Sequence, residues 1–376
     1  MRAALPAQPH RVLMTADTVG GIWRHAFELG AELIRRGVQV TIATLGAPPS
    51  AEQRREAERA NIELFAGHYR LEWMDDPWAD VERAGEWLLA LAEVLNPDLV
   101  HLNGFAHGAL PWSRPHLIVA HSCVCSWWEA VHEAQPASIE EYRRRVQVGL
   151  RATQWIAAPS RAMLEALNRH YGPLATGRVI HNGSSGGYHN MVKRPLILSV
   201  GRAWDAGKNF DMLSLAAPDI AWPVCLAGPL RHPEGGVRSL PGLRTLGNLD
   251  AETLRHWYGA ASLFMAPACY EPFGLAALEA ARAGCALILG DIPSQRELWD
   301  GAAVFVDPDD PAAMAAAAND LINNASRRRY FMKAAREQAR RYSATLMANA
   351  YLRLYSDMLQ SSLPRVSGGE GRRCAS

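Results

Sequence analysis

The segment Ala268-Cys-Tyr-Glu-Pro-Phe-Gly-Leu-Ala-Ala-Leu-Glu-Ala280 decides how the rest of the chain is interpreted. A strand-like apolar run, Ser262–Pro267, precedes it, and small and apolar residues typical of a helix end it. Pro272 suits a first helical turn, where its missing N–H costs nothing. Free backbone amides near the helix start would then form a site for an anion or a hydroxyl group. These amides belong to Phe273, Gly274 and Leu275.

Two acids accompany this predicted turn. Glu271 lies just before the predicted helix, and Glu279 lies within it. Carboxylates at this spacing can accept hydrogen bonds from sugar hydroxyls at two depths of one pocket. Alternatively, Glu271 is only a helix-start acid favoured by the helix dipole, and Glu279 is an exposed helical residue. The residues alone leave both interpretations open.

Short β-branched runs alternate with longer amphipathic stretches along the whole chain, which is typical of parallel sheets covered by helices. Strands in the first half are predicted at Arg11–Ala16, Val38–Thr44, Ile62–Phe65, Asp98–Leu102, His116–His121, Gln154–Ala158 and Arg178–His181. Strands in the second half are predicted at Leu196–Gly201, Val224–Ala227, Leu243–Leu246, Ser262–Pro267, Ala286–Leu289 and Ala303–Val306. Helices are predicted at Trp23–Arg36, at Arg161–His170 with Ser160 as its cap, at Asp309–Asn323 and at Ser326–Tyr342. The fold class is therefore α/β.

The chain has 376 residues, more than a single hydrophobic core usually supports, so two domains are expected. Between the two series of strands lies Asn182-Gly-Ser-Ser-Gly-Gly-Tyr188, which has the composition of a hinge. We expect an N-terminal Rossmann-like domain over 1–190 and a C-terminal domain over 191–345. Residues 346–363 are expected to form a helix able to pack back toward the first domain. The Gly- and Ser-rich tail over 364–376 is expected to be disordered.

The composition excludes several classes of protein. Lys plus Arg number 39 and Asp plus Glu number 38, which gives no electrostatic reason to expect a nucleic acid partner. No segment approaches the roughly 20 uninterrupted apolar residues of a membrane span, and the first ten residues lack the apolar core of a signal peptide. Cys123 and Cys125 are not spaced as zinc ligands. We therefore expect a cytoplasmic protein without a structural metal.

Glu271 and Glu279, separated by seven residues with Pro-Phe-Gly after the first, resemble the signature of the retaining glycosyltransferases of family 4, also called glycosyl transferases group 1. The resemblance runs through nearly the whole second half of the chain. Its other segments are Ser199-Val-Gly201-Arg202 followed by Lys208, Ala227-Gly-Pro229, Leu246-Gly-Asn248, and Asp291-Ile-Pro293 followed by Arg296-Glu297. The resemblance implies the GT-B fold, in which two Rossmann-like domains direct their parallel sheets toward an interdomain cleft.

The resemblance also implies roles for residues of the second half. Arg202 and Lys208, in the segment that begins with Gly201, would hold the donor diphosphate. Two fixed cations there would stabilise the charge that grows on the leaving group. Glu279 would bind the ribose, and Glu271 would contact the transferred sugar with help from the amides of Phe273, Gly274 and Leu275. Without the resemblance, an ordinary solvated loop would be the preferred interpretation of Arg202 and Lys208.

In the first half, Gly20 and Gly21 join the first predicted strand to the first helix. They lack the GxGxxG spacing of a dinucleotide site, but two glycines let the backbone approach a ligand closely. They are similar to the family's glycine loop beside the donor phosphate; a plain tight turn is the alternative. His121 ends a predicted strand where the family has a histidine that reaches the donor sugar. His101, at the end of the preceding strand, competes as a residue of the cleft.

Two further features allow more than one interpretation. Trp112, Trp127 and Trp128 suit either core packing or an aromatic platform for a sugar acceptor. The run Arg143–Arg145 suits a solvated helix face or, as a weaker idea, a contact with acidic lipid head groups.

Together these features predict a retaining, metal-independent transfer of a hexosyl unit from a nucleotide-diphosphate sugar, with UDP-glucose as the first guess. The acceptor would be a glycan, a lipid-linked molecule or a small molecule, and a peripheral contact with the inner face of a membrane stays open. No cofactor beyond the donor is expected. The alternatives are another GT-B enzyme such as a nucleotide-sugar epimerase, and a catalytically silent relative that binds a sugar or a partner protein. A nicotinamide-dependent dehydrogenase is disfavoured because GxGxxG is missing.

Overall fold

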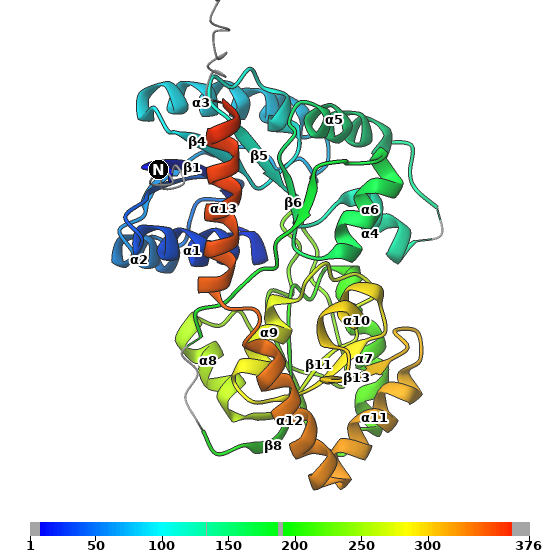
Figure 1. Ribbon diagram of the computed structural model, residues 1–376. Coiled ribbons are helices and arrows are strands. Elements are labelled where there is room, and N and C mark those ends of the chain that lie inside the picture. The colour runs from blue at the N-terminus through cyan, green and yellow to red at the C-terminus, as the bar shows by residue number, and fades with distance from the viewer. Residues whose placement is uncertain (1–7, 133, 187–190, 363–376) are drawn as a thin grey trace, which may run out of the picture.

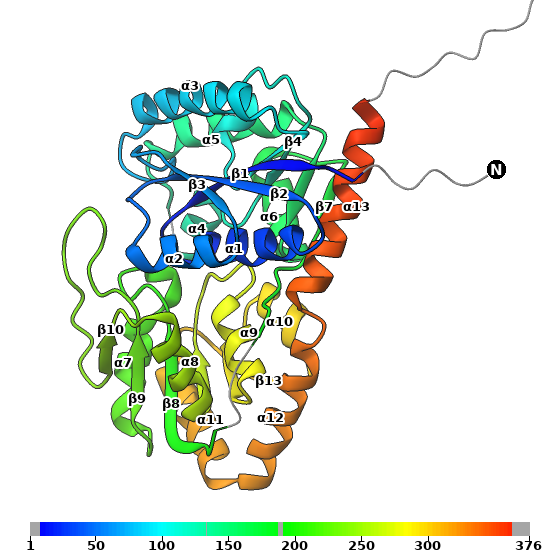
Figure 2. The same ribbon diagram turned by 90° about the vertical axis from the view of Figure 1, so that its left-hand side faces the viewer.

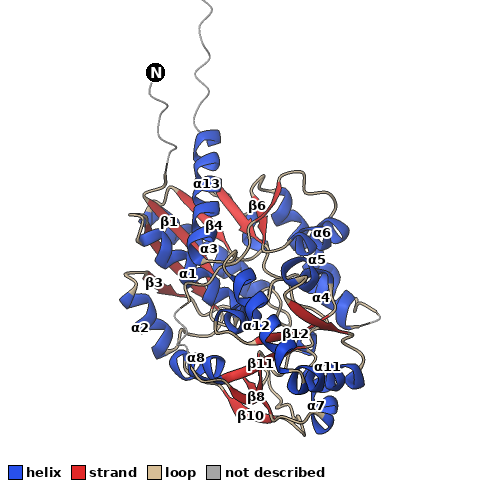
Figure 3. Cartoon of the chain, turned by 60° about the horizontal axis from the view of Figure 1, so that its bottom comes forward, coloured by secondary structure: helices blue, strands red, loops and turns tan. Residues whose placement is uncertain are grey.

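The computed structural model describes residues 8–132, 134–186 and 191–362, and it arranges them as two α/β lobes stacked one on the other (Figure 1). Each lobe is built around one sheet, of seven strands in the first lobe and six in the second. All strand pairs in both sheets run parallel. Parallel strands need crossover connections, and helices supply all of these except the one between β9 and β10; helices also cover both faces of each sheet, as Figure 3 shows.

The first sheet has the strand order β3-β2-β1-β4-β5-β6-β7. Its strands are β1 Arg11–Asp17, β2 Gln39–Leu45, β3 Glu63–Ala66, β4 Leu99–Leu102, β5 His116–Val119, β6 Ile156–Ala158 and β7 Gly177–Val179. Its helices are α1 Gly21–Ile34, α2 Ala51–Arg59, α3 Trp78–Leu95, α4 Val124–Val131, α5 Ile139–Arg151 and α6 Arg161–Tyr171. A short 3₁₀ helix, η1, covers Ala106–Ala109. The order reverses direction at β1 and β4, so the loops after these two strands open a crevice at the carboxyl edge.

The second sheet has the order β10-β9-β8-β11-β12-β13. Its strands are β8 Arg194–Val200, β9 Val224–Ala227, β10 Arg244–Gly247, β11 Ala261–Ala266, β12 Ala286–Gly290 and β13 Ala303–Val306. Its helices are α7 Phe210–Ala216, α8 Ala251–Ala260, α9 Leu275–Arg282, α10 Pro293–Trp299, α11 Pro311–Asn323 and α12 Ala325–Ala339. Short 3₁₀ helices cover Ala206–Lys208 (η2) and Ala217–Asp219 (η3). The central pair is β8 and β11, so the crevice of this lobe lies at their carboxyl ends.

The last helix, α13 (Ala344–Ser362), leaves the second lobe and runs along the first (Figure 2). Its buried side chains join the apolar core that α1 and the first sheet share. They are Met347, Ala348, Tyr351, Leu354, Tyr355 and Met358. The core of the first lobe is therefore completed by a segment that follows the second lobe in the sequence.

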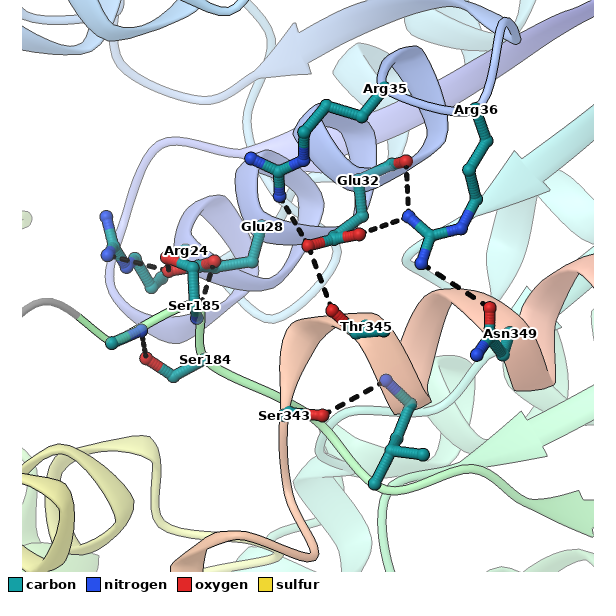
Figure 4. A network of polar contacts seen from close by, with 12 residues as sticks. Arg24, Glu28, Glu32, Arg35, Arg36, Ser184, Ser185, Ser343, Thr345 and Asn349 are labelled. Carbon is teal, nitrogen blue, oxygen red and sulfur yellow. Dashed lines mark hydrogen bonds and ion pairs between the residues drawn. The ribbon is translucent and has the colours of Figure 1, made fainter.

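Polar contacts fix α13 against α1, as Figure 4 shows. Glu32, although it lies on the buried face of α1, pairs with Arg35 and Arg36 and accepts a hydrogen bond from the Thr345 hydroxyl at 3.3 Å. Arg36 also lies 3.4 Å from the side-chain oxygen of Asn349. A buried acid costs stability unless it is paired, and these partners supply the pairing.

The predicted α/β class and the thirteen predicted strands are confirmed, with end positions shifted by a few residues. Ser160 caps α6 as expected, since its hydroxyl accepts from the amide of Met163 at 3.1 Å. The domain boundary placed near residue 190 falls in the segment 187–190, which lies outside the described residues, and so does the tail over 364–376.

Two local predictions were wrong. His121 does not end a strand, because β5 stops at Val119 and His121 lies in the loop before α4. Pro272 is not in a helical turn, because α9 begins only at Leu275. The reason is Gly274, whose φ of 88° belongs to the left-handed region and keeps the preceding residues out of the helix.

Candidate active site

The glycine loop of the first lobe touches the loop after β8 in the second. Gly20 has a φ of 84°, and a Cβ placed on it would lie 3.3 Å from Nη1 of Arg202. A Cβ on Gly21 would lie 3.7 Å from a side-chain methyl of Leu275. Glycine is needed at residue 20 both for this backbone conformation and for the close approach of Arg202. The structure thus brings Gly20, Gly21, Arg202 and Leu275 together across the cleft.

Arg202 is held in place by an acid that also receives a group from the first lobe. The guanidinium of Arg202 donates to Oδ2 of Asp205 at 2.6 Å, and the indole of Trp127 in α4 donates to Oδ1 at 3.0 Å. Burial opposes the ionisation of Asp205, but the charges of Arg202 and Lys208 and these hydrogen bonds outweigh it and lower its pKa. Asp205 therefore stays ionised and keeps Arg202 at the cleft.

Lys208 and Glu271 form the second charged pair of the site, with Nζ 2.6 Å from Oε2. Both side chains are about one fifth exposed, 19% and 20%, so they remain accessible to a ligand. They line a small pocket together with Phe210, Gly274 and Gln295. Gly201 lies beside it, since a Cβ there would lie 3.6 Å from Cδ of Lys208. The predicted cation and the predicted sugar-contacting acid thus meet at one pocket.

The turn that carries Glu271 is fixed from both lobes. Ser294 of α10 donates its hydroxyl hydrogen to the carbonyl of Glu271 at 2.6 Å, and Gln295 donates to the carbonyl of Phe273 at 3.2 Å. From the first lobe, Ser160 donates to the carbonyl of Pro272 at 2.6 Å. The ring of Phe273 is buried in the core, so only its backbone can serve a ligand. Rigid support of this kind is what a binding turn needs.

Glu279 lies in α9 and faces Arg24 of α1, with Oε1 3.7 Å from Nε. Arg24 is shared, because its guanidinium also lies 2.7 Å from Glu28 and 3.6 Å from Glu56. The side chain of Glu279 is 15% exposed. The residue predicted to bind ribose is therefore at the interface of the two lobes, on the same side as the glycine loop.

His121 and His101, the two histidines predicted as alternative residues of the cleft, differ in their burial. His101 is fully buried, whereas His121 is partly exposed. Their rings form a group with His25 of α1, whose ring centroid is 4.4 Å from that of His121. Burial lowers the pKa of His101 to about 3 and that of His25 to about 4, and burial together with these two rings lowers the pKa of His121 well below its usual range. All three imidazoles are neutral at pH 7.

His121 is connected to the pocket through neighbouring residues. The hydroxyl of Ser122, the next residue, lies 3.3 Å from the hydroxyl of Tyr270, which precedes Glu271. The amide of Cys123 also donates to that Tyr270 hydroxyl at 3.1 Å. Gly20 and Gly21 therefore contact predicted site residues of the second lobe directly, whereas His121 is connected to Glu271 only through its chain neighbours and Tyr270.

Asp17 was missed by the sequence reasoning. It is the last residue of β1, 9% exposed, and its Oδ1 accepts from the amide of Val19 at 3.0 Å. Burial raises its pKa to about 7, although the nearby charge of Arg202 acts in the opposite direction. The signal was available, because an acid that ends a central parallel strand lies where such folds bind ligands. An acid titrating near neutrality in a cleft is typical of a functional site.

A second missed feature is an aromatic pair that spans the lobes. Trp73 and Trp204 stack with ring centroids 6.3 Å apart and planes 20° from parallel. The three tryptophans singled out in the sequence are instead tied to the protein: Trp127 binds Asp205, Trp112 donates to the carbonyl of His107 at 2.9 Å, and Trp128 packs in the core.

The remaining sequence hypotheses concern charge. In the run Arg143–Arg145, Arg143 pairs with Glu140, Arg144 with Glu141, and Arg145 with both Glu141 and Glu82, so glutamates balance this helix face locally.

No group of three or more His, Cys, Asp or Glu side chains in the described part of the chain is arranged to hold a metal ion. Among the helices described, none has the length and apolar character needed to cross a membrane.

The sequence and the structure were then compared with known proteins. The model of Glycosyltransferase Family 4 matches residues 19–184, and that of Glycosyl transferases group 1 matches residues 194–324. O-antigen chain mannosyltransferase B of Escherichia coli is 29% identical over 164 residues, which is 43% of this chain and 38% of that protein. GDP-mannose:cellobiosyl-diphosphopolyprenol alpha-mannosyltransferase of Komagataeibacter xylinus is 39% identical over 124 residues, 32% of this chain and 31% of that protein. The matches to these two relatives thus span well under half of their lengths.

Other matches extend over nearly the whole chain. Alpha-maltose-1-phosphate synthase of Mycolicibacterium smegmatis is 25% identical over 385 residues, covering 90% of this chain and 96% of that protein. Sucrose-phosphate synthase (tll1590) from Thermosynechococcus elongatus superposes with a TM-score of 0.78 at 20% identity, over 94% of this chain and 100% of the other. Anabaena Alr3699/HepE in complex with UDP and glucose has a TM-score of 0.72 at 14% identity, over 93% and 100%. These structures share the fold, and the two family models match successive halves of the chain. The protein therefore belongs to the GT-B glycosyltransferases of the family 4 and group 1 type.

Proposed function

We propose that the protein transfers a hexosyl unit from a nucleotide-diphosphate sugar to an acceptor in the cleft between the lobes. The observation that carries this proposal is the close approach of Gly20 and Arg202 across the two lobes, together with the pairing of Lys208 with Glu271 at the small pocket. The backbone at Gly20 and two cations suit a diphosphate. The carboxylates of Glu271 and Glu279 suit the hydroxyls of sugar and ribose.

Each predicted cation already has a carboxylate partner, which decides how a diphosphate would bind. Asp205 holds Arg202, and Glu271 holds Lys208. The two carboxylates already balance the charges of the two cations. A diphosphate would therefore bind as an additional partner of cations that the carboxylates hold in position. Pre-positioned cations cost little reorganisation as charge grows on the leaving group. Arg202 and Lys208 would in this way take the role that a metal ion has in other transferases.

The proposed reaction retains the configuration at the anomeric carbon. The bond from that carbon to the diphosphate oxygen breaks while the bond to the acceptor oxygen forms on the same face. The acceptor hydroxyl proton passes to the leaving phosphate oxygen, so no protein nucleophile is needed. Closure of the two lobes would exclude water and suppress hydrolysis of the donor.

The donor and acceptor are proposed by class. UDP-glucose is the first donor to test, supported by the UDP and glucose bound to the Anabaena protein of the same fold, and GDP-mannose is the second, supported by the two mannosyltransferase relatives. The acceptor would be a glycan, a lipid-linked molecule or a small molecule, bound mainly by the first lobe.

The proposal is tested by thermal shift with UDP-, GDP- and ADP-sugars in the presence of EDTA. A donor present at about 100 times its dissociation constant should add roughly 2.7 kcal/mol of stability. We expect one nucleotide class to stabilise the wild type, and Lys208→Ala and Glu279→Ala to lose most of this gain. Arg238→Ala is the matched control, because Arg238 is an exposed arginine of the same lobe that pairs with Asp211.

Binding alone does not separate transfer from other donor chemistry. Incubation of the binding donor with a panel of glycans and lipid-linked sugars should yield a glycosylated product with the anomeric configuration of the donor. Release of an altered free sugar would favour an epimerase, and an inverted product would contradict retention. Failure of every nucleotide sugar to stabilise the wild type would reject the proposal.

A further inference from the structure

A chain of hydrogen bonds joins α13 to His121 through buried residues. The hydroxyl of Tyr355 lies 2.7 Å from Nδ1 of His101. Nε2 of His101 lies 3.1 Å from Oδ1 of Asn103, and the same oxygen lies 2.8 Å from Nε2 of His121. The helix that returns from the second lobe is thus connected to a histidine of the cleft.

The orientation of the Asn103 amide is determined by its other contact. Nδ2 of Asn103 lies 2.6 Å from the backbone carbonyl of Thr15, and a carbonyl can only accept a hydrogen bond. The NH₂ group must therefore face Thr15, and Oδ1 must face the two imidazoles. The backbone amide of Asn103 donates to the Thr15 hydroxyl at 2.9 Å and fixes the residue further. Because Oδ1 only accepts, His101 and His121 must both donate from Nε2.

A neutral imidazole that is protonated on Nε2 has a lone pair on Nδ1. The lone pair of His101 accepts from the Tyr355 hydroxyl. Among the residues that the structure describes, no hydrogen bond to Nδ1 of His121 is found, and this ring is partly exposed. His121 therefore has an acceptor atom available to a ligand of the cleft.

We propose that Asn103 is a positioning residue that fixes His121 as the Nε2–H tautomer, so that Nδ1 of His121 accepts a hydrogen bond from a hydroxyl of the bound hexosyl group. The tautomer follows from contacts within the protein, whereas the identity of the ligand rests on the proposed function. The opposite tautomer would present an N–H donor and would leave the Asn103 oxygen facing an imidazole lone pair at 2.8 Å. At the other end of the hydrogen-bond chain, Tyr355 donates to His101 and fixes its orientation.

The first test is the nitrogen NMR spectrum of ¹⁵N-histidine-labelled full-length protein at pH 7 without ligand, with His121→Gln to assign the signals. We expect His121 and His101 both to show a protonated Nε2 and an unprotonated Nδ1. A protonated Nδ1 on His121, or an imidazolium, would overturn the proposal. This measurement needs no activity.

The second test replaces Asn103 by an isosteric acid. The titratable groups that face His121 are His25 of α1 and His101 of β4, with Tyr351 and Tyr355 of α13 beyond them. Asn103→Asp should raise the titration midpoint of His121 by one pH unit or more, since a carboxylate within hydrogen-bonding distance favours the imidazolium. The second oxygen of the new carboxyl group would face the Thr15 carbonyl, so its ionisation is followed by ¹³C NMR in the same titration. An unchanged His121 midpoint beside the ionised carboxylate would contradict a direct contact.

Two tyrosines of the same helix supply a matched pair of variants. Tyr355→Phe should shift the Nδ1 signal of His101, because it removes the donor. Tyr351→Phe should leave it unchanged, because the buried Tyr351 hydroxyl has no hydrogen-bond partner among the described residues although its ring lies 5.2 Å from that of His101. Equal effects of the two variants would reject the hydrogen bond from Tyr355 to His101 and with it the hydrogen-bond chain. This comparison can be made even if Asn103→Asp does not fold.

The ligand part of the proposal is tested by adding UDP-glucose and GDP-mannose to the labelled wild type. A donor that stabilises the protein should move the Nδ1 signal of His121 toward the hydrogen-bonded range. A donor that binds without moving it would reject the contact with the sugar. Failure of all donors to bind would reject the proposed function instead, while the tautomer is decided by the ligand-free spectrum.

Discussion

Asp17 shows how a single buried residue of the candidate site can lower stability. Its carboxyl group is buried at the end of β1, and its pKa is raised from 3.8 to about 7. At pH values between these two pKa values, Asp17 is ionised in the unfolded chain but still protonated in the folded protein. The free energy of unfolding therefore falls as the pH rises through this range. Above about pH 7 the loss is complete and amounts to roughly 4 kcal/mol as an upper bound.

Asp17→Asn should therefore raise the midpoint of thermal unfolding, by several degrees at pH 8 and by less at pH 5, because the variant cannot ionise. Differential scanning calorimetry at the two pH values checks this. Asp75→Asn, at an exposed position, is the control and should change neither midpoint. A gain of equal size at both pH values would show that burial of the Asp17 charge is not the cause.

At the scale of elements, side chains of one lobe satisfy helix N-termini of the other. Glu297 of α10 accepts from the amides of Arg161 and Ala162 at the start of α6, at 2.8 and 2.9 Å. In the opposite direction, Glu52 of α2 accepts from the amide of Ala251 at the start of α8 at 2.9 Å. The first amides of a helix have no partner within it, and an acid there also interacts favourably with the helix dipole. These contacts hold the lobes in the orientation that forms the cleft.

Glu297→Ala should remove both partners from α6 and cost about 1 kcal/mol, the typical value of a helix cap. We expect faster hydrogen exchange at the amides of Arg161 and Ala162, measured by NMR or mass spectrometry. Glu165→Ala, on the exposed side of the same helix, should leave their exchange unchanged. Unaltered exchange in the Glu297 variant would mean that the cap does not protect these amides.

At the scale of the whole molecule, α13 makes the two lobes interdependent. It follows the second lobe in the sequence, yet its apolar side chains complete the core of the first. Each large buried side chain contributes about 1.5–3 kcal/mol, so five of them are comparable to the whole stability of a typical domain. They are Met347, Tyr351, Leu354, Tyr355 and Met358.

A chain that ends at Ser343 should therefore lose the cooperative unfolding of the first lobe and bind a hydrophobic dye. Calorimetry and dye fluorescence check this outcome. A chain that ends at Ser362 keeps α13 and should melt like the full-length protein. Unfolding of the shorter chain at the wild-type temperature would contradict the assigned role of α13.

The fold class, the positions of the thirteen described strands and several of the residues that meet between the lobes could be predicted from the sequence. This is because these features depend on local periodicity and on residues that follow strands, such as Gly20, Arg202 and Glu271. A parallel sheet brings all of its strand ends to one edge, so position along the chain predicts position in space.

The pairing of charges across the lobes and the different burial of the two histidines depend on tertiary packing. Glu279 faces Arg24, Asp205 accepts from Trp127, and Glu297 accepts from the amides of α6, all across the two lobes, and no local pattern encodes such contacts. His101 lies in β4, where it is buried and contacts Tyr355 of α13, whereas His121 lies in the loop after β5 and is partly exposed. The raised pKa of Asp17 has the same origin, because the two lobes and their loops together remove its carboxyl group from water.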